Sequence, residues 1–337
     1  MKNLILTTAI FFAACCAAFS QKVYTSVSDA LKNPSSVTVL DLSGQGLTGI
    51  ASEVSRLTNL EVIYLQDNNL KTLPEEICSI SSLQMIYADG NNIATIPAKI
   101  TDLKRLKVLS LGNNHLTEFP TSVTELSNLE SLNLAANLIP NVDGKISGLN
   151  KLIELDLSYN KITVLPNQLG KLSSLEVLSL AGNKISTTES LAGLKKISIL
   201  YLDECPLKKI EPVVLSLVSL KKLSMSKCGI SEIPAGITKL THLTHLLLSE
   251  NNISKLPNPL FSVTSLVELN VASNAITVLP EGIGNLTSLY DLNLCNNRID
   301  EIPIVVEKKM SVLHYIGLSG TGVQMFNSAA NGDKIAY

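Results

Sequence analysis

The residues with the clearest potential for chemistry are His245, Glu268 and Asp291, which follow one another at intervals of 23 residues. An imidazole and two carboxylates are groups that a zinc ion accepts as ligands, so a convergent arrangement would suggest a metal site. If the three side chains instead project in parallel from neighbouring strands, ion pairing is the better interpretation. His242 and His245 also form an HxxH pair, a spacing that has little specificity alone. We therefore expect no metal site.

Other arrangements typical of enzymes are missing from the sequence. It contains no glycine-rich nucleotide loop, no Ser-His-Asp or Cys-His arrangement and no zinc-ligand spacing outside a regular repeat that occupies most of the chain. The sequence therefore predicts a protein that is not an enzyme, has no catalytic residues and needs no cofactor.

The interval of 23 residues is the period of that repeat. Its clearest copy is the segment 106–128, LKVLSLGNNHLTEFPTSVTELSN, with the pattern LxxLxLxxNxLxxFPxxVxxLxx. The apolar residues of one unit point to one side, so each unit must stack on its neighbours to bury them. Thirteen units of 22 to 24 residues fill positions 37–323, and they begin at Val37, Leu60, Leu83, Leu106, Leu129, Leu152, Leu175, Ile197, Leu220, Leu243, Leu266, Leu289 and Leu313.

The second half of several units carries an LPxxI motif, as in LPEEI (73–77), LPNQL (165–169), IPAGI (233–237) and LPEGI (279–283). With these motifs the chain resembles leucine-rich-repeat proteins of the LPxxI subtype, which is similar to the repeats of plant disease-resistance-type proteins, of animal Ras-pathway scaffolds and of many secreted bacterial proteins. The resemblance implies an α/β leucine-rich-repeat solenoid, a horseshoe with a parallel β-sheet on its concave face. Each LxxLxL would form a strand of about three residues, with strands about 4.8 Å apart.

A column of asparagines follows the strands and is expected to satisfy backbone groups at the bend of each unit. It comprises Asn68, Asn91, Asn114, Asn137, Asn160, Asn183, Asn251, Asn274 and Asn297, with Gln45, Cys205, Cys228 and Thr321 in the same slot. Because Cys is a common substitute there in the family that the chain resembles, we interpret Cys205 and Cys228 as members of this ladder rather than as a disulfide. Two units depart from the pattern, with Asp143 in place of Pro and Thr188 in place of Leu, and we expect a looser outer surface there.

Residues 1–20 have the features of a signal peptide. Lys2 precedes an apolar run from Leu4 to Ala18, and Ala18-Phe19-Ser20 is a small-x-small cleavage site. The alternative is a lipoprotein box, Phe12-Ala13-Ala14-Cys15, with a lipid anchor at Cys15 or Cys16. The prediction is an exported protein (periplasmic, cell-surface or secreted) without a transmembrane span, and a cytoplasmic protein if the leader is misread.

The segments that flank the repeats are short. Residues 21–36 are expected to form an N-terminal cap, because Ser26-Val27-Ser28-Asp29 has the spacing of a capping box and opens one or two helical turns that end at Asn33-Pro34. Such a cap would cover the open leucines of the first unit. Residues 324–337 remain as a C-terminal cap or tail.

Side chains alternate across a strand, so the residues between the leucines should face the concave side. Reading them across adjacent units predicts one apolar and aromatic patch, rimmed by Asp67 and Asp89 and composed of Val39, Val62, Tyr64, Met85, Tyr87 and Val108. Tyr201, with Val177 and Ile199, would form a smaller patch. Exposed aromatic residues on a rigid sheet favour an interaction surface. The alternative is that β-branched and aromatic residues simply suit strands.

Charge gives little indication of a nucleic-acid or membrane partner, because the formal net charge of the 337 residues is −2. Lysines 195, 196, 208, 209, 221, 222 and 227 are clustered and could contact phosphate or an acidic partner, although a solvated ridge is the simpler interpretation. The sequence therefore predicts a non-enzymatic scaffold that binds a protein or peptide on its concave face. A structural or adhesive surface protein and an intracellular signalling scaffold are the alternatives.

Overall fold

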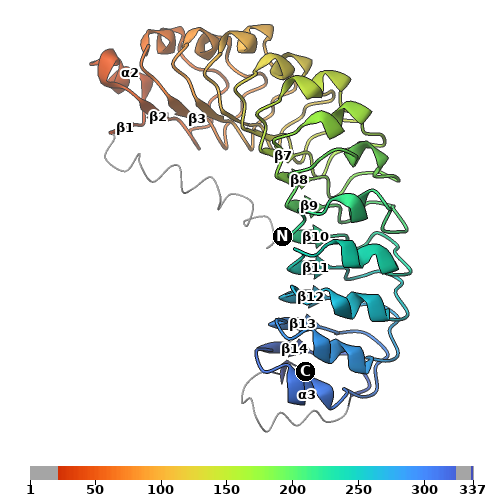
Figure 1. The fold of residues 1–337 in the computed structure, drawn as a ribbon. Helices are drawn as coiled ribbons and strands as arrows, with labels where there is room; N and C mark the ends of the chain where they lie inside the picture. Colours follow the sequence, from red (N-terminus) through yellow and green to blue (C-terminus); the bar gives the residue numbers. More distant parts are fainter. Residues whose placement is uncertain (1–21, 324–334, 337) are drawn as a thin grey trace.

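The structure, a computed structural model, describes residues 22–323 together with the backbone of residues 335 and 336. These residues form one parallel sheet of 15 strands, in which the strands follow one another in sequence order from β1 to β15. The chain winds into a curved solenoid with the strands on its inner side and the short helices on its outer side (Figure 1). The predicted leader, its cleavage site and the lipid-anchor cysteines lie outside the described residues.

Each of the thirteen units contributes one strand of three residues. The strands are β2 (Val39–Asp41), β3 (Val62–Tyr64), β4 (Met85–Tyr87), β5 (Val108–Ser110), β6 (Ser131–Asn133), β7 (Glu154–Asp156), β8 (Val177–Ser179), β9 (Ile199–Tyr201), β10 (Lys222–Ser224), β11 (His245–Leu247), β12 (Glu268–Asn270), β13 (Asp291–Asn293) and β14 (Tyr315–Gly317). Equivalent residues pair directly, as in Val62 with Met85 and Met85 with Val108. The predicted strand length and parallel order are confirmed.

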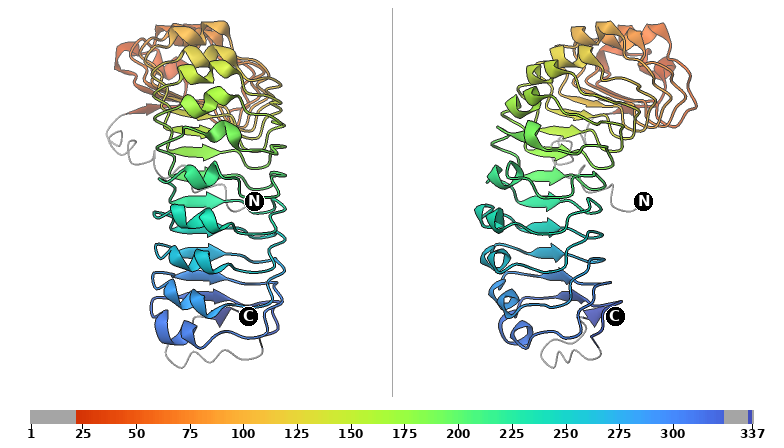
Figure 2. Two further views of the ribbon diagram at one scale, coloured as in Figure 1. Left: turned by 45° about the vertical axis from the view of Figure 1, so that its right-hand side comes forward. Right: turned by 90° about the vertical axis from the view of Figure 1, so that its right-hand side faces the viewer.

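The outer side consists almost entirely of 3-10 helices. They are η3 (Ser52–Arg56), η4 (Glu75–Ser79), η5 (Ala98–Asp102), η6 (Thr121–Glu125), η7 (Gly144–Gly148), η8 (Asn167–Lys171), η9 (Glu189–Leu191), η10 (Val214–Ser216), η11 (Ala235–Lys239), η12 (Asn258–Ser262) and η13 (Glu281–Asn285), followed by α3 (Val305–Lys309). They stack in a row along the convex face (Figure 2). In the LPxxI units the helix begins after the proline, whose ring fixes φ and which has no N–H to satisfy.

The asparagine ladder is present as predicted. Nδ2 of Asn114 donates to the carbonyls of Ala88 at 3.0 Å, Leu111 at 3.1 Å and Gly112 at 3.1 Å, and Oδ1 accepts from the amide of Ile93 at 2.9 Å. These four bonds satisfy backbone groups that the parallel strands cannot reach, at a site where the asparagine is only 5% exposed. Each unit is thereby joined to the one before it.

Cys205 and Cys228 occupy ladder positions as free thiols, which confirms that interpretation. The thiol of Cys228 donates to the carbonyl of Leu202 at 3.0 Å, and that of Cys205 to the carbonyl of Leu180 at 3.4 Å. Burial raises the pKa of Cys228 to about 12 and that of Cys205 to about 11, so both stay protonated donors at neutral pH. Gln45 differs, because it is exposed and its Nε2 donates to Thr25 of the N-terminal segment at 2.9 Å.

The N-terminal segment contains a strand that the sequence pattern did not reveal. Strand β1 (Val23–Tyr24) pairs in parallel with β2 and extends the sheet by one strand. Ser26 then caps α2 (Val27–Ala30) by accepting from the amide of Asp29 at 3.1 Å, as the capping-box spacing predicted. The α-helix ends at Ala30, earlier than expected, and a 3-10 turn, η2 (Pro34–Ser36), follows. At the other end, β15 (Ile335–Ala336) pairs with β14.

The expectation of a looser outer surface is wrong at the unit that carries Thr188. Thr188 is 1% exposed, and both its amide and its hydroxyl donate to Oε2 of Glu211, at 2.5 and 2.7 Å. A polar threonine can replace leucine there because the next unit supplies a carboxylate for it. Asp143, in the other unusual unit, caps η7 by accepting from the amide of Lys145 at 2.7 Å.

A left-handed residue precedes the ladder position in every unit. Glycines 44, 90, 182 and 320 fill four of these positions, and the others are Asp67, Asn113, Ala136, Tyr159, Glu204, Lys227, Glu250, Ser273 and Asn296, with φ between 51 and 58°. This conformation disfavours residues with a Cβ atom, except Asn and Asp, which tolerate it better. The repeat therefore contains several positions with local backbone strain, which the periodic leucine pattern does not disclose.

Candidate functional site

The inner face of the sheet displays two columns of side chains, the first and the third residue of each strand. The middle residue of each strand points into the core. Ile63 and Ile86 are therefore fully buried, whereas Tyr64 and Tyr87, the next residues on the same strands, are only half-buried. The tyrosines therefore lie on the concave face and not among the leucines. This is the surface on which the sequence placed its candidate residues.

The six residues of the predicted first patch lie together on strands β2 to β5, and we call them the aromatic patch. The rings of Tyr64 and Tyr87 stack with centroids 5.2 Å apart and an angle of 10° between planes. The hydroxyl of Tyr87 donates to Sδ of Met85 at 3.8 Å. Val39 and Val108, at the two ends, are each only 5% exposed, so the accessible part of the patch consists of Val62, Met85 and the two tyrosines.

Asp89 does not form the rim that we expected beside this patch. Its Oδ1 accepts from the hydroxyl of Ser110 at 2.7 Å, the amide of Gly112 at 2.8 Å and Nδ2 of Asn133 at 3.1 Å. Burial raises the pKa of Asp89 even though the bonds from Ser110 and Gly112 oppose this effect. Asp89 thus joins three units together, and only Asp67 lies exposed at the strand ends of the patch.

The third strand position has a structural task in many units. Asp156, for example, accepts from the amide of Ser158 at 2.9 Å and closes the turn after the strand. Tyr87 and Tyr201 cannot do this, and in both units an aspartate two residues later bonds to the turn of the following unit, whose third strand residue is a serine. Asp203 accepts from Ser224 at 2.6 Å and from the amide of Ser226 at 2.8 Å, as Asp89 does with the unit after it. This Tyr-x-Asp signal is visible in the sequence but was missed.

Tyr201 lies on β9, five strands beyond Tyr87, so the structure does not bring it into the aromatic patch. Nζ of Lys222 lies 5.5 Å from the centre of its ring, within the range of a cation–π contact. Val177 is 8% exposed and Ile199 is half-buried. The second predicted patch therefore consists of Tyr201 and Ile199 beside a lysine.

Between these two sites, strand β7 places Glu154 and Asp156 on the concave face. We call them the central carboxylates. Burial and the charge of Asp156 raise the pKa of Glu154 to about 7, although a hydrogen bond from Ser131 opposes the shift. Burial also raises the pKa of Asp156, against the bonds from Ser158. Nothing in the sequence pattern singles out this pair, because its environment depends on the neighbouring strands.

His245, Glu268 and Asp291 occupy equivalent positions on three neighbouring strands. Nε2 of His245 lies 3.9 Å from Oε2 of Glu268, which is the expected ion-pair geometry. Burial lowers the pKa of His245 while Glu268 opposes this, so the imidazole is mostly neutral at neutral pH. Within residues 22–323, no three His, Cys, Asp or Glu side chains are grouped so that they could hold a metal ion.

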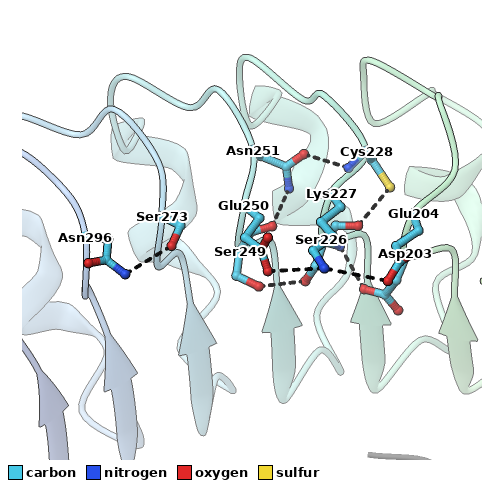
Figure 3. A network of polar contacts seen from close by, with 10 residues as sticks. All are labelled: Asp203, Glu204, Ser226, Lys227, Cys228, Ser249, Glu250, Asn251, Ser273 and Asn296. Atoms are coloured by element: carbon cyan, nitrogen blue, oxygen red, sulfur yellow. Dashed lines mark hydrogen bonds and ion pairs between the residues drawn. The ribbon is translucent and has the colours of Figure 1, made fainter. Parts of the chain in front are cut away.

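The clustered lysines are distributed over both ends of the strands and are partly neutralised. Lys227 lies between Glu204 at 3.7 Å and Glu250 at 3.6 Å, along the row of strand-end turns drawn in Figure 3. Lys209 lies 4.0 Å from Glu211. Exposed pairs of this kind contribute little free energy. The arrangement is that of a solvated ridge.

A second stacked pair was missed by the sequence reasoning. The rings of Tyr290 and His314 lie 4.8 Å apart at an angle of 2°, just before β13 and β14. Tyr290 is 44% exposed. Because it is far along the sheet from the aromatic patch, it provides a matched control for substitutions there.

Comparison with protein families gives consistent results along the chain. The family profile "Leucine-rich repeat region" matches residues 97–213 and 181–319, and the profile "Leucine rich repeat" matches residues 35–93. No curated protein matches the sequence. Among the residues that the structure describes, no helix is both apolar and long enough to span a bilayer.

Several solved structures share the fold. A leucine-rich-repeat protein of Leptospira interrogans is 27% identical, with a TM-score of 0.70, over 90% of this chain and 95% of its own. An internalin of Listeria monocytogenes is 25% identical, with a TM-score of 0.79, over 91% of this chain and 88% of its own. The ectodomain of the receptor kinase GASSHO1/SCHENGEN3 of Arabidopsis thaliana, in complex with CASPARIAN STRIP INTEGRITY FACTOR 2, is 23% identical, with a TM-score of 0.69, over 84% of this chain and 40% of its own.

Proposed function

The chain belongs to the leucine-rich-repeat family, and we propose that it is an exported, non-enzymatic scaffold that binds a protein or peptide through the aromatic patch on its concave face. The observation that carries this proposal is the pair of stacked, half-buried tyrosines beside Met85 and Val62 on neighbouring strands of the concave face. Tyrosine and methionine are typical of protein-binding surfaces, where a few residues provide most of the binding free energy.

Rigidity supports the same proposal. Strands of the patch are held in register by backbone pairing, and Asn68, Asn91 and Asn114 fasten the bends behind them. A surface of this kind loses little conformational entropy when a ligand binds. The Arabidopsis ectodomain, solved with a bound factor, is an example of the same fold holding a ligand.

The test is a selection of displayed 12-residue peptides on the purified protein. We expect peptides with aromatic or aliphatic residues to be enriched and to bind the Tyr64→Ala/Tyr87→Ala variant at least about tenfold more weakly, since truncation of one central tyrosine commonly costs about 1–2 kcal/mol. The variant should keep its melting temperature within a few degrees, because neither ring is part of the leucine core. Tyr290→Ala is the matched control and should bind normally.

Equal binding by wild type and the folded tyrosine double variant would remove the patch from consideration. The export part of the proposal needs a separate measurement, the mass of the native N-terminus. A chain that begins at Gln21 indicates a cleaved leader, an acylated Cys15 or Cys16 indicates a lipoprotein, and an intact Met1 contradicts export.

A further inference from the structure

We infer that the ligand of the aromatic patch is an extended polypeptide segment that carries a lysine or arginine about four residues from its apolar anchor, and that the central carboxylates receive this basic side chain. The inference rests on the proposed function, because it names the chemistry of the partner of the same face. It is derived from the distribution of charge along the concave columns and from the spacing of the strands.

The concave columns are acidic although the chain as a whole is nearly neutral. The first and third strand positions of the thirteen units contain one lysine, Lys222, and five carboxylates, which are Asp41, Glu154, Asp156, Glu268 and Asp291. Complementary charge at an interface selects partners more than it strengthens binding. A basic segment therefore fits this face better than an acidic one.

The central carboxylates differ from the other acidic residues on the face. Glu268 lies beside His245, and β7 is the only one of the thirteen repeat strands with a carboxylate at both its first and its third position. Within residues 22–323, neither Glu154 nor Asp156 has a cationic side chain within 4.0 Å. Two half-buried carboxylates two residues apart on one strand repel each other, and a ligand cation between them would relieve that repulsion.

The spacing of the strands determines how many residues separate the apolar and the basic residue of the ligand. Tyr87 is on β4 and Glu154 on β7, which are three strands apart, and strands are separated by about 4.8 Å, so the two sites are about 14 Å apart along the face. An extended chain advances about 3.3–3.6 Å per residue, so about four residues span this distance. The apolar residue on the patch and the basic residue at the carboxylates are thus about four positions apart, in either direction.

The experiment uses a 12-residue peptide selected on the wild-type protein and a copy in which its basic residue is norleucine. We expect Glu154→Gln/Asp156→Asn to weaken binding of the selected peptide about tenfold and to change binding of the norleucine copy less than about twofold. The variant should fold normally, because an asparagine at this position keeps the strand-end acceptor, as Asn133 does with the amide of Ala135 at 2.9 Å. Glu268→Gln/Asp291→Asn, five strands farther along, is the matched control.

The inference is overturned if the selected peptides lack a basic residue at this spacing, or if the central carboxylate variant binds them as wild type does. Failure of the proposed function would give a different result, in which the Tyr64→Ala/Tyr87→Ala variant binds the selected peptide as strongly as the wild type does. If the control pair at β12 and β13 produces the larger loss, the basic residue lies elsewhere on the face and the assignment to Glu154 and Asp156 is wrong.

Discussion

Replacement of Glu154 by Gln should stabilise the protein at alkaline pH and have little effect in mild acid. The carboxyl has an ordinary pKa of 4.5, which burial and the adjacent Asp156 raise to about 7 in the folded chain. A carboxyl with a raised folded pKa binds its proton more tightly when folded. Its contribution to stability is therefore greatest below pH 4.5, falls as the pH rises from 4.5 to 7, and is lost above 7.

The size of the effect follows from the same shift. A change from 4.5 to about 7 corresponds at most to about 3 kcal/mol at 1.36 kcal/mol per pKa unit. Glu154 retains contact with solvent, which screens its charge, so we expect the substitution to stabilise the fold by about 1–2 kcal/mol at pH 8. For a chain of this length that is a rise in melting temperature of roughly 2–3 °C.

Thermal unfolding followed by circular dichroism at pH 8 and pH 5 measures this directly. Glu125→Gln, an exposed carboxylate on the convex helix η6, is the control and should leave the melting temperature unchanged at both pH values. A stabilisation of the same size at pH 5, or a loss of stability at pH 8, would refute the reasoning. Either result would mean that the environment of Glu154 in the folded protein does not disfavour its charged form.

Substitutions at three further positions test the account of the fold. Asn114→Ala removes four hydrogen bonds at a buried site and should lower the free energy of unfolding by about 2–5 kcal/mol in urea titrations, whereas Asn114→Cys should cost less because a thiol can still donate. Ala136→Gly should stabilise by about 0.5–1 kcal/mol, since glycine removes the penalty of a residue with φ of 51°, and a loss of stability would contradict this. Glu211→Gln should destabilise by about 1–3 kcal/mol at neutral pH. Burial raises the pKa of Glu211, but the bonds from Thr188 outweigh it and hold the pKa below its ordinary value. This stability is therefore present above pH 4.5 and is lost as the pH falls through the lower folded pKa. A cost that does not decrease as the pH is lowered below 4.5 would contradict the assignment.

Periodicity made most of the fold predictable from the sequence. Leucines at a constant interval determine which residues enter the core, and the asparagines and cysteines in the ladder slot bond to the backbone as predicted. The type of outer helix was harder to predict from the sequence. A unit of 22 to 24 residues has room for a short helical turn of either the α or the 3-10 type. The pairing of Thr188 with Glu211 was also hidden, since it joins side chains of two different units that are 23 residues apart in the sequence.

The candidate site was predictable in position but not in detail. Alternation along the strands placed Tyr64 and Tyr87 correctly on the concave face. The same rule could not show that Val39 and Val108 are nearly covered by their neighbours, or that Asp89 is engaged by three later residues. Exposure and charge state depend on what the adjacent units contribute, and those contacts are not encoded within a single repeat.

The most direct test of the central claim is the dissociation constant of a peptide selected on the wild-type protein, measured by fluorescence anisotropy with the wild type and with Tyr64→Ala/Tyr87→Ala. We predict that the double variant, folded and with an almost unchanged melting temperature, binds at least about tenfold more weakly, while Tyr290→Ala binds as the wild type does. Equal affinity of the wild type and the folded double variant would contradict recognition through the concave tyrosines.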